Sequence, residues 1–528
     1  MSETQATQLG GPSLEAARAG SFSLSATAIL SGVAAAKLLI HLAGIRHYGF
    51  FRDELYYMAC GEHLAWGYVD QPPLIALLAW ISRHLLGNSI VSLRLLPVMS
   101  GVAVVYLTGV LARELGGGRF AQFLASVSIL CATAYLAFDS FFSMNAFEPL
   151  FWLICTWLAV RIAKGASTKL WLVFGLVAGV ALENKHTMLV FGFALVVGLV
   201  LAGRWDLFRS PWVWLGGLLA LALFAPNLMW EARHGWPQVE VVRNAQLYKN
   251  VAISPLRFLG EQAVFMNPLS LPVWFGGLLW CLFAREGKPF RFLGWAYPIV
   301  LVVFVVFNGK SYYALPIYPA LMAAGGVAFE RFSDVSARRW LRVAFPAVLV
   351  AGAALAAPFG VPVLQIGRFV RYSEMLPFAQ SVKTERDAVS VELPQLYADM
   401  FGWDTLATTV AHVYRDLPEA DRAGCGILAG NYGEAGAVDY YGPALGLPKA
   451  LSGHNSYYYW GPRGYSGSCM IIYGERSEEF IKYFGDVRAA ATSASPNAMP
   501  NERNVVIYVC RRPIAPLAVL WPRFKLII

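Results

Sequence analysis

The stretch VSLRLLPVMSGVAVVYLTGVLA, residues 91–112, decides the fold because it is long and apolar enough to cross a bilayer as one helix. Similar stretches recur along the chain, near residues 23–43, 120–138, 144–163, 170–184, 187–203, 211–230, 269–284, 292–308, 312–329 and 340–358. Of the 528 residues, 57% are apolar and only 14% are charged, too few charges to cover a soluble protein of this length. The sequence therefore predicts a mainly α, polytopic membrane protein of about eleven transmembrane helices.

Basic residues between the predicted spans give an orientation. They gather in alternate loops, which the positive-inside rule places in the cytoplasm. The net charge of +9 is thus explained by the basic loops that set the membrane topology, and it does not indicate nucleic-acid binding. The loops 44–90 and 231–268 then face outside, although they also carry some basic residues. The polar segment 1–21 lacks the features of a cleaved signal peptide, so the first span is expected to be retained.

The chain changes character after about residue 360. Residues 1–360 form the predicted transmembrane domain, and residues 361–512 are polar, with strand-like runs at 425–429, 469–473 and 505–510. Helix-like segments at 404–417 and 478–484 alternate with those runs, which predicts an extracytoplasmic α/β domain. Its cysteines Cys425, Cys469 and Cys510 allow one disulfide without fixing the pair. The tail, 513–528, is expected to lie on the membrane surface.

The first outer loop, residues 44–90, carries the adjacent acids Asp53 and Glu54. A helical stretch, 55–65, and an amphipathic one, 74–86, flank a stiff turn that contains Asp70, Pro72 and Pro73. Amphipathic helices too polar to span lie along the membrane interface, and would hold the acids at headgroup depth. A carboxylate there can take a proton from a hydroxyl or bind a divalent cation. Alternatively, Asp53 caps a helix and Glu54 is a favourable first-turn charge.

The run FFRDELYYMACGEHLAWGYVDQPPL, residues 50–74, resembles the first periplasmic loop of the glycosyltransferase-C superfamily. The similar branch includes the lipid A aminoarabinose transferase and relatives of the dolichyl-phosphate-mannose protein mannosyltransferases. The resemblance reaches to about residue 330 and implies that Asp53 is a catalytic base or metal-organising acid, with Glu54 and Asp70 in the same acidic group. Gln71 departs from the aminoarabinose transferase, which has a lysine there, and this puts the same donor sugar in doubt.

Three further polar segments lie at predicted outer ends of spans. The first, 141–149, contains Asn145 and Glu148, and the resemblance makes Glu148 a partner of Asp53 in holding a cation. Its alternative role is a helix-start carboxylate beside Pro149. The second, 183–186, offers Lys185 for the donor phosphate.

The third segment, 308–316, resembles a Lys-x-x-Tyr-x-x-Pro pattern of the family and makes Lys310 a second phosphate ligand. Asn145, His186, Tyr312 and Tyr313 are candidate substrate-binding residues. His186 is equally well explained as an interfacial histidine, and the two tyrosines as part of the interfacial aromatic belt. In the outer domain, residues 430–434 and the aromatic run 452–462 are better explained as a turn and a structural loop.

These segments together supply acids to activate an acceptor and lysines to stabilise a departing phosphate. We therefore expect a glycosyltransferase of the cytoplasmic membrane that moves a sugar from a polyprenyl-phosphate donor to a glycolipid, glycan or protein acceptor at the outer face. A divalent cation is the one cofactor expected. A transporter or flippase of a lipid-linked sugar and a non-catalytic assembly protein are the alternatives.

Overall fold

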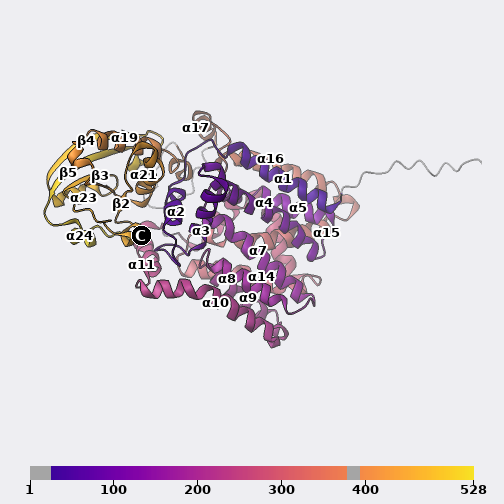
Figure 1. The fold of residues 1–528 in the computed structure, drawn as a ribbon. Helices are drawn as coiled ribbons and strands as arrows, with labels where there is room; N and C mark the ends of the chain where they lie inside the picture. Colours follow the sequence, from indigo (N-terminus) through magenta and orange to yellow (C-terminus); the bar gives the residue numbers. More distant parts are fainter. Residues whose placement is uncertain (1–24, 252, 377–392) are drawn as a thin grey trace, which may run out of the picture.

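The computed structural model describes residues 25–251, 253–376 and 393–528 and has two parts (Figure 1). A bundle of apolar helices forms the larger part, and an α/β domain covers one end of it. The bundle consists of α1 (Ala26–Gly44), α4 (Ile90–Glu114), α5 (Arg119–Leu130), α6 (Thr133–Phe138), α7 (Met144–Ala163), α8 (Leu170–Leu182), α9 (Met188–Leu201), α10 (Pro211–Arg233), α13 (Leu271–Phe283), α14 (Arg291–Val306), α15 (Tyr318–Phe332) and α16 (Leu341–Ala356). The polar segment 1–21 lies outside the described residues.

Each predicted span has a helical counterpart, but not all are long enough to cross a membrane. Among the described residues, seven helices pass by length and composition, or eight if one bent pair counts as a single span. Helices α5, α8 and α9 are apolar but shorter. The chain is thus an integral membrane protein, and the predicted number of eleven spans exceeds what helix length supports.

The bent pair consists of α12 (Pro255–Phe265) and the segment that includes α13, at an angle of 91°. Asn267 lies at the break with φ 66°, and its side chain accepts a hydrogen bond from the N–H of Leu269. Pro268 has no N–H and disfavours helical geometry in the preceding residue, so the helix cannot continue through this point.

Two short helices lie between the bundle and the outer domain: α2 (Arg52–Glu62) and α3 (Leu74–Ile81) (Figure 1). The helical part of the predicted amphipathic loop is thus present. The side chains of α2 are mostly buried, since they pack against the outer domain on one side and the bundle on the other. Helix α2 is thus part of the protein core. In the second stretch, 74–86, Leu77, Leu85 and Leu86 are exposed, and its place at the membrane interface stays a prediction.

The outer domain contains a five-stranded sheet in the order β2-β1-β3-β5-β4. Strands β2, β1 and β3 are parallel, and β5 and β4 are antiparallel additions at one side. The strands are β1 (Cys425–Ala429), β2 (Leu451–Ser452), β3 (Cys469–Tyr473), β4 (Phe484–Ala494) and β5 (Asn504–Pro513); the main helices are α19 (Trp403–Arg415) and α21 (Tyr432–Leu445). Cys425 and Cys469 are register partners on β1 and β3 and form a disulfide, which leaves Cys510 free.

The two faces of this sheet bury different sets of residues, as the alternation of side chains along strands requires. Ile427 and Ile471 face a core that continues into α2, whereas Leu428 and Ile472 face a second core. That second core contains Leu517, Leu520, Trp521 and Phe524 of the C-terminal tail. One side of the tail therefore packs on the sheet, while Ile514 and Val519 are exposed. The expected contact of the tail with the membrane surface stays a prediction.

Candidate active site

Glu54 fixes the beginning of α2 and is fully buried. Its carboxylate receives two hydrogen bonds from Arg94 of α4, at 3.0 and 2.8 Å. It also accepts the backbone N–H groups of Phe51 and Phe142, both at 2.8 Å. With four donors and no exposed surface, Glu54 acts as a positioning residue in this structure, and the catalytic role expected from the sequence does not fit the geometry.

Asp53 is the exposed member of the acid pair, with 30% of its side chain accessible. The hydroxyl of Tyr432, the first residue of α21, donates a hydrogen bond of 2.9 Å to Oδ1 of Asp53. Nε of Arg52 lies 4.0 Å from the same oxygen. Asp53 thus faces the junction of α2 with the outer domain, and it does not cap its helix, because the residue at the cap position is Phe51.

Asp70 lies in the turn before the double proline and faces the same junction. Tyr56 of α2 donates a hydrogen bond of 2.7 Å to Oδ1 of Asp70. Burial raises the pKa of Asp70 to about 6, and the nearby charge of Asp53 contributes to the increase. The charges of both aspartates also raise the pKa of Tyr57, after the larger effect of burial. Asp53 and Asp70 therefore interact electrostatically, across Tyr56 and Tyr57 of α2.

Gln71 follows Asp70 at the position where a lysine was expected from the resemblance. Its side chain is buried, and its amide nitrogen lies 3.5 Å from Sγ of Cys60. The turn thus presents no cation to a donor phosphate at this position.

Lys185 is the centre of a second, basic group. Its Nζ donates to Oδ1 of Asn145 at 2.8 Å and to Oε2 of Glu148 at 2.9 Å, and it lies 4.4 Å from the ring centroid of Tyr313. The hydroxyl of Thr187 donates to the other oxygen of Glu148. Glu148 is thus the counter-ion of Lys185.

Lys310 and the tyrosines extend this basic group. The rings of Tyr312 and Tyr313 are 4.9 Å apart, and Nζ of Lys310 lies 5.9 Å from the ring of Tyr312. Each tyrosine therefore has a lysine near its ring: Lys185 from the turn after α8, and Lys310 from the position just before the 3₁₀ segment Ser311–Ile317. His186 is directed elsewhere: its ring nitrogen bonds to Asn227, whose amide donates to the carbonyl of Trp66. We find no substrate-binding geometry for His186.

Hydrogen bonds join three of the four predicted segments, and the contact of Lys185 with the ring of Tyr313 adds the fourth. The N–H of Leu74, at the start of α3, donates to the carbonyl of Glu183 at 2.8 Å. Asn184 donates to the carbonyl of Met144, and Lys185 bonds to Asn145 and Glu148 in the first turns of α7. The acidic and basic groups therefore lie on either side of the segment that leads into α7.

The residues do not fit a cation shared by Asp53 and Glu148. Both oxygens of Glu148 already have protein donors. In the part of the chain that the structure describes, no group of three or more His, Cys, Asp or Glu side chains could hold a metal ion. A cation at Asp53 stays a prediction, and no chemical step below involves it.

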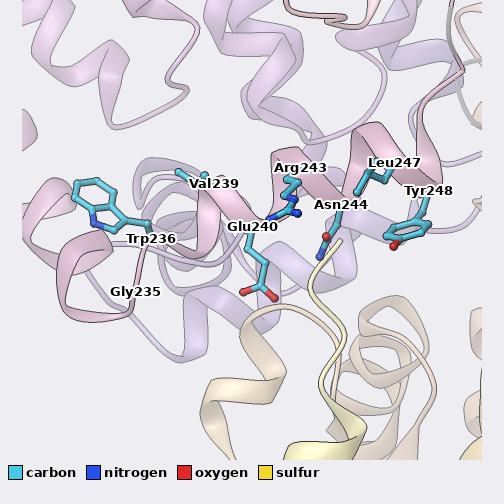
Figure 2. A pocket seen from close by; sticks show the side chains of 8 residues that line it. All are labelled: Gly235, Trp236, Val239, Glu240, Arg243, Asn244, Leu247 and Tyr248. Carbon is cyan, nitrogen blue, oxygen red and sulfur yellow. The ribbon is translucent and has the colours of Figure 1, made fainter.

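A hollow of about 480 Å³ lies on α11 (Pro237–Asn244) and the turn after it, and none of the candidate site residues lines it (Figure 2). The C-terminal segment contacts residues 237–249, called the arm below: Nζ of Lys525 lies 2.9 Å from Glu240, and Asn244 donates to the carbonyl of Ile527 at 2.6 Å. The arm ends at Lys249, whose charge lowers the pKa of Asp70. Its connection to the site is through that charge.

Comparison with known proteins supports one family. A family model described as dolichyl-phosphate-mannose-protein mannosyltransferase matches residues 70–230. The crystal structure of ArnT from Cupriavidus metallidurans bound to undecaprenyl phosphate superposes with a TM-score of 0.60 at 15% identity, covering 92% of this chain and 98% of that one. Its apo structure gives the same score. Residues 70–230 are thus similar to this family of membrane glycosyltransferases, and the chain has the fold of ArnT.

A curated protein similar to this chain is the lipid A galacturonosyltransferase RgtD of Rhizobium johnstonii. The two are 26% identical over 265 residues, which is 48% of this chain. The match spans about half of the relative, 54% of its length.

Sequence reasoning missed four residues of this candidate site. Arg94 was detectable as a basic residue inside a predicted span, where a charge needs a partner. Tyr56 and Tyr432 carried no signal, because tyrosines are common at membrane interfaces. Residues 430–434, taken as a simple turn, supply Tyr432, and the aromatic run supplies Ser456, whose Oγ is 2.7 Å from the hydroxyl of Tyr56.

Proposed function

We propose that the chain is a membrane glycosyltransferase that moves a sugar from a polyprenyl-phosphate donor to a glycolipid acceptor at the outer face of the cytoplasmic membrane. The observation that carries the proposal is that contacts join the segments of the acids Asp53 and Asp70 to those of the lysines Lys185 and Lys310. ArnT in complex with undecaprenyl phosphate and the lipid A galacturonosyltransferase support the choice of donor and acceptor class.

In the proposed reaction, Asp53 takes the proton from an acceptor hydroxyl while the oxygen of that hydroxyl attacks C1 of the donor sugar. The bond between C1 and the phosphate oxygen breaks, and polyprenyl phosphate leaves with the electron pair. Lys185 and Lys310 stabilise the charge on the departing phosphate. A single displacement of this kind inverts the configuration at C1.

The two aspartates differ in a way that suits Asp53 as the base. Burial raises the pKa of Asp70 to about 6, and Asp70 accepts a hydrogen bond from Tyr56. Asp53 has 30% of its side chain accessible, so an acceptor can reach it. Carboxylates in different environments often divide acid and base roles in this way.

The experiment uses purified protein in lipid nanodiscs with a polyprenyl-phosphate-linked sugar fraction and glycolipids extracted from the host membranes. We expect free polyprenyl phosphate to appear in equal amount with a glycolipid heavier by one sugar residue, both detected by mass spectrometry. A flippase would leave the bond between sugar and phosphate intact. Absence of both products with the folded protein would refute the proposal.

A further inference from the structure

We infer that Tyr432 of the outer domain is a positioning residue for Asp53, so that the reaction site is complete only when the outer domain is docked on α2. The inference rests on the proposed function. It assigns a role in the reaction to the outer domain, where neither the sequence pattern nor the resemblance indicates a catalytic residue.

The contact between the two domains is direct. The Tyr432 hydroxyl donates to Oδ1 of Asp53 at 2.9 Å, and Arg52 approaches the same oxygen. The Tyr432 ring stacks on Tyr56 with centroids 4.6 Å apart, and Tyr56 in turn donates to Asp70. One side chain of the outer domain therefore contacts both Asp53 and the residue that orients the second aspartate.

The start of α21 holds Tyr432 rigidly. Asn431 accepts the N–H of Glu434 at 2.9 Å, while Glu434 accepts the N–H of Asn431 at 3.0 Å, which forms a capping box. Glu434 also accepts the N–H of Glu475 at 2.9 Å, and Asn431 donates to Glu502 at 3.0 Å. Tyr432 is thus the first residue of a helix whose N-terminus is fixed to two other parts of the outer domain.

Two glycines of α21 allow the close approach. A Cβ on Gly433 would lie 2.4 Å from Cγ of Arg52, and one on Gly436 would lie 3.0 Å from the backbone carbon of Leu55. The Gly436 contact is with the backbone of α2, which cannot rotate away as a side chain can. Small residues at these positions bring the helices close enough for the Tyr432 hydroxyl to reach Asp53.

The hydrogen bond selects which oxygen of Asp53 is used. Tyr432 and Arg52 both approach Oδ1, and within the described parts of the chain no hydrogen bond reaches Oδ2. A carboxylate held through one oxygen presents the other in a fixed direction to an acceptor hydroxyl. Without the hydrogen bond from Tyr432, the carboxylate can rotate. A misplaced catalytic group lowers the rate of the reaction far more than the affinity for substrate.

The test is Tyr432→Phe, which removes the hydroxyl and keeps the ring on Tyr56. The matched control is Tyr440→Phe on the same helix, because Tyr440 donates to the carbonyl of Asn88 at 3.3 Å, away from Asp53. Using the same nanodisc assay with increasing amounts of the polyprenyl-phosphate-linked sugar fraction, we expect Tyr432→Phe to lower kcat about tenfold or more. KM for the donor and the thermal unfolding midpoint should stay near those of the parent and of the control.

The inference and the proposed function fail in different ways. If Asp53→Asn is inactive while Tyr432→Phe keeps the parent kcat, the inference is overturned and the function stands. If Tyr432→Phe loses kcat only in proportion to a fall in its unfolding midpoint, Tyr432 is merely structural and the inference is overturned as well. Gly436→Ala provides a second variant: it forces α21 away from α2, and kcat should fall although Tyr432 is still present. Full activity of Asp53→Asn would overturn both claims.

Discussion

Replacement of Arg94 by Met tests whether the buried ion pair with Glu54 holds the start of α2. Both side chains are fully buried, and the guanidinium supplies two hydrogen bonds of 3.0 and 2.8 Å. Without it, the Glu54 carboxylate keeps only the N–H groups of Phe51 and Phe142. Removing one partner of a buried pair costs about 3–5 kcal/mol, because the remaining charge is left uncompensated.

The matched control is Arg83→Met. Arg83 also pairs with a glutamate, Glu62, at 2.7 Å, but that pair is partly exposed and should contribute about 0–1 kcal/mol. The free energy of unfolding is measured by denaturant titration of the purified proteins in detergent. The double variant Arg94→Met with Glu54→Gln should recover part of the loss, since the isolated charge is gone. Equal stability of Arg94→Met and Arg83→Met would refute the role assigned to the pair.

Three further predictions follow from the site and the outer domain. Lys185→Ala should weaken the binding of undecaprenyl phosphate by about tenfold or more, because it removes a cation from the basic group. Lys185→Arg should keep most of the affinity. Binding is measured by native mass spectrometry, and equal affinities of the two variants would contradict the assignment. Above pH 7, Asp70→Asn should raise the free energy of unfolding by up to about 3 kcal/mol, since a pKa raised to about 6 means that the charged carboxylate is disfavoured in the folded state. This gain in stability should shrink as the pH falls through 6. A gain that does not depend on pH would show that burial of the Asp70 charge is not its cause. Replacement of Cys425 and Cys469 by Ser should lower the stability of the protein by about 2–4 kcal/mol, as measured by thermal unfolding with and without reductant; an unchanged midpoint would mean that the disulfide does not form in the purified protein.

Much of the fold could be predicted from hydropathy, because long apolar runs have few solutions in a membrane. The runs at 91–112, 144–163 and 211–230 coincide with α4, α7 and α10. The number of spans was less certain, since α8 and α9 are shorter than a simple span and the helix before α13 is broken at Asn267. Helix length in such cases depends on neighbours that a sequence does not display.

The outer domain was predicted in outline only. The runs at 425–429 and 469–473 are β1 and β3, because both strands are buried on two faces and so read as apolar runs. The strand β4 was missed: its burial pattern is mostly exposed, with little apolar signal. The disulfide partners followed from strand register, which only the fold could supply.

The charged residues of the site could be predicted from the sequence, but the residues that contact them could not. Asp53, Lys185 and Lys310 were recognised near the outer ends of predicted spans and Asp70 in the turn of the first outer loop, and the structure joins their segments. Partners such as Tyr432 lie far away in the sequence, and a tyrosine alone does not indicate which carboxylate it will meet. Pairing across that distance is a property of the docked domains.

The most direct test of the proposed function is made in cells. A strain that lacks this protein is complemented with the parent chain, with Asp53→Asn or with the matched control Glu62→Gln, whose carboxylate pairs with Lys449 and Arg83 on the exposed side of α2. Mass spectrometry of the envelope glycolipids then measures the species that carries one additional sugar, at equal levels of membrane-inserted protein. We predict that the parent and Glu62→Gln restore this species and that Asp53→Asn does not. Full restoration by Asp53→Asn would contradict the assignment of Asp53 as the base.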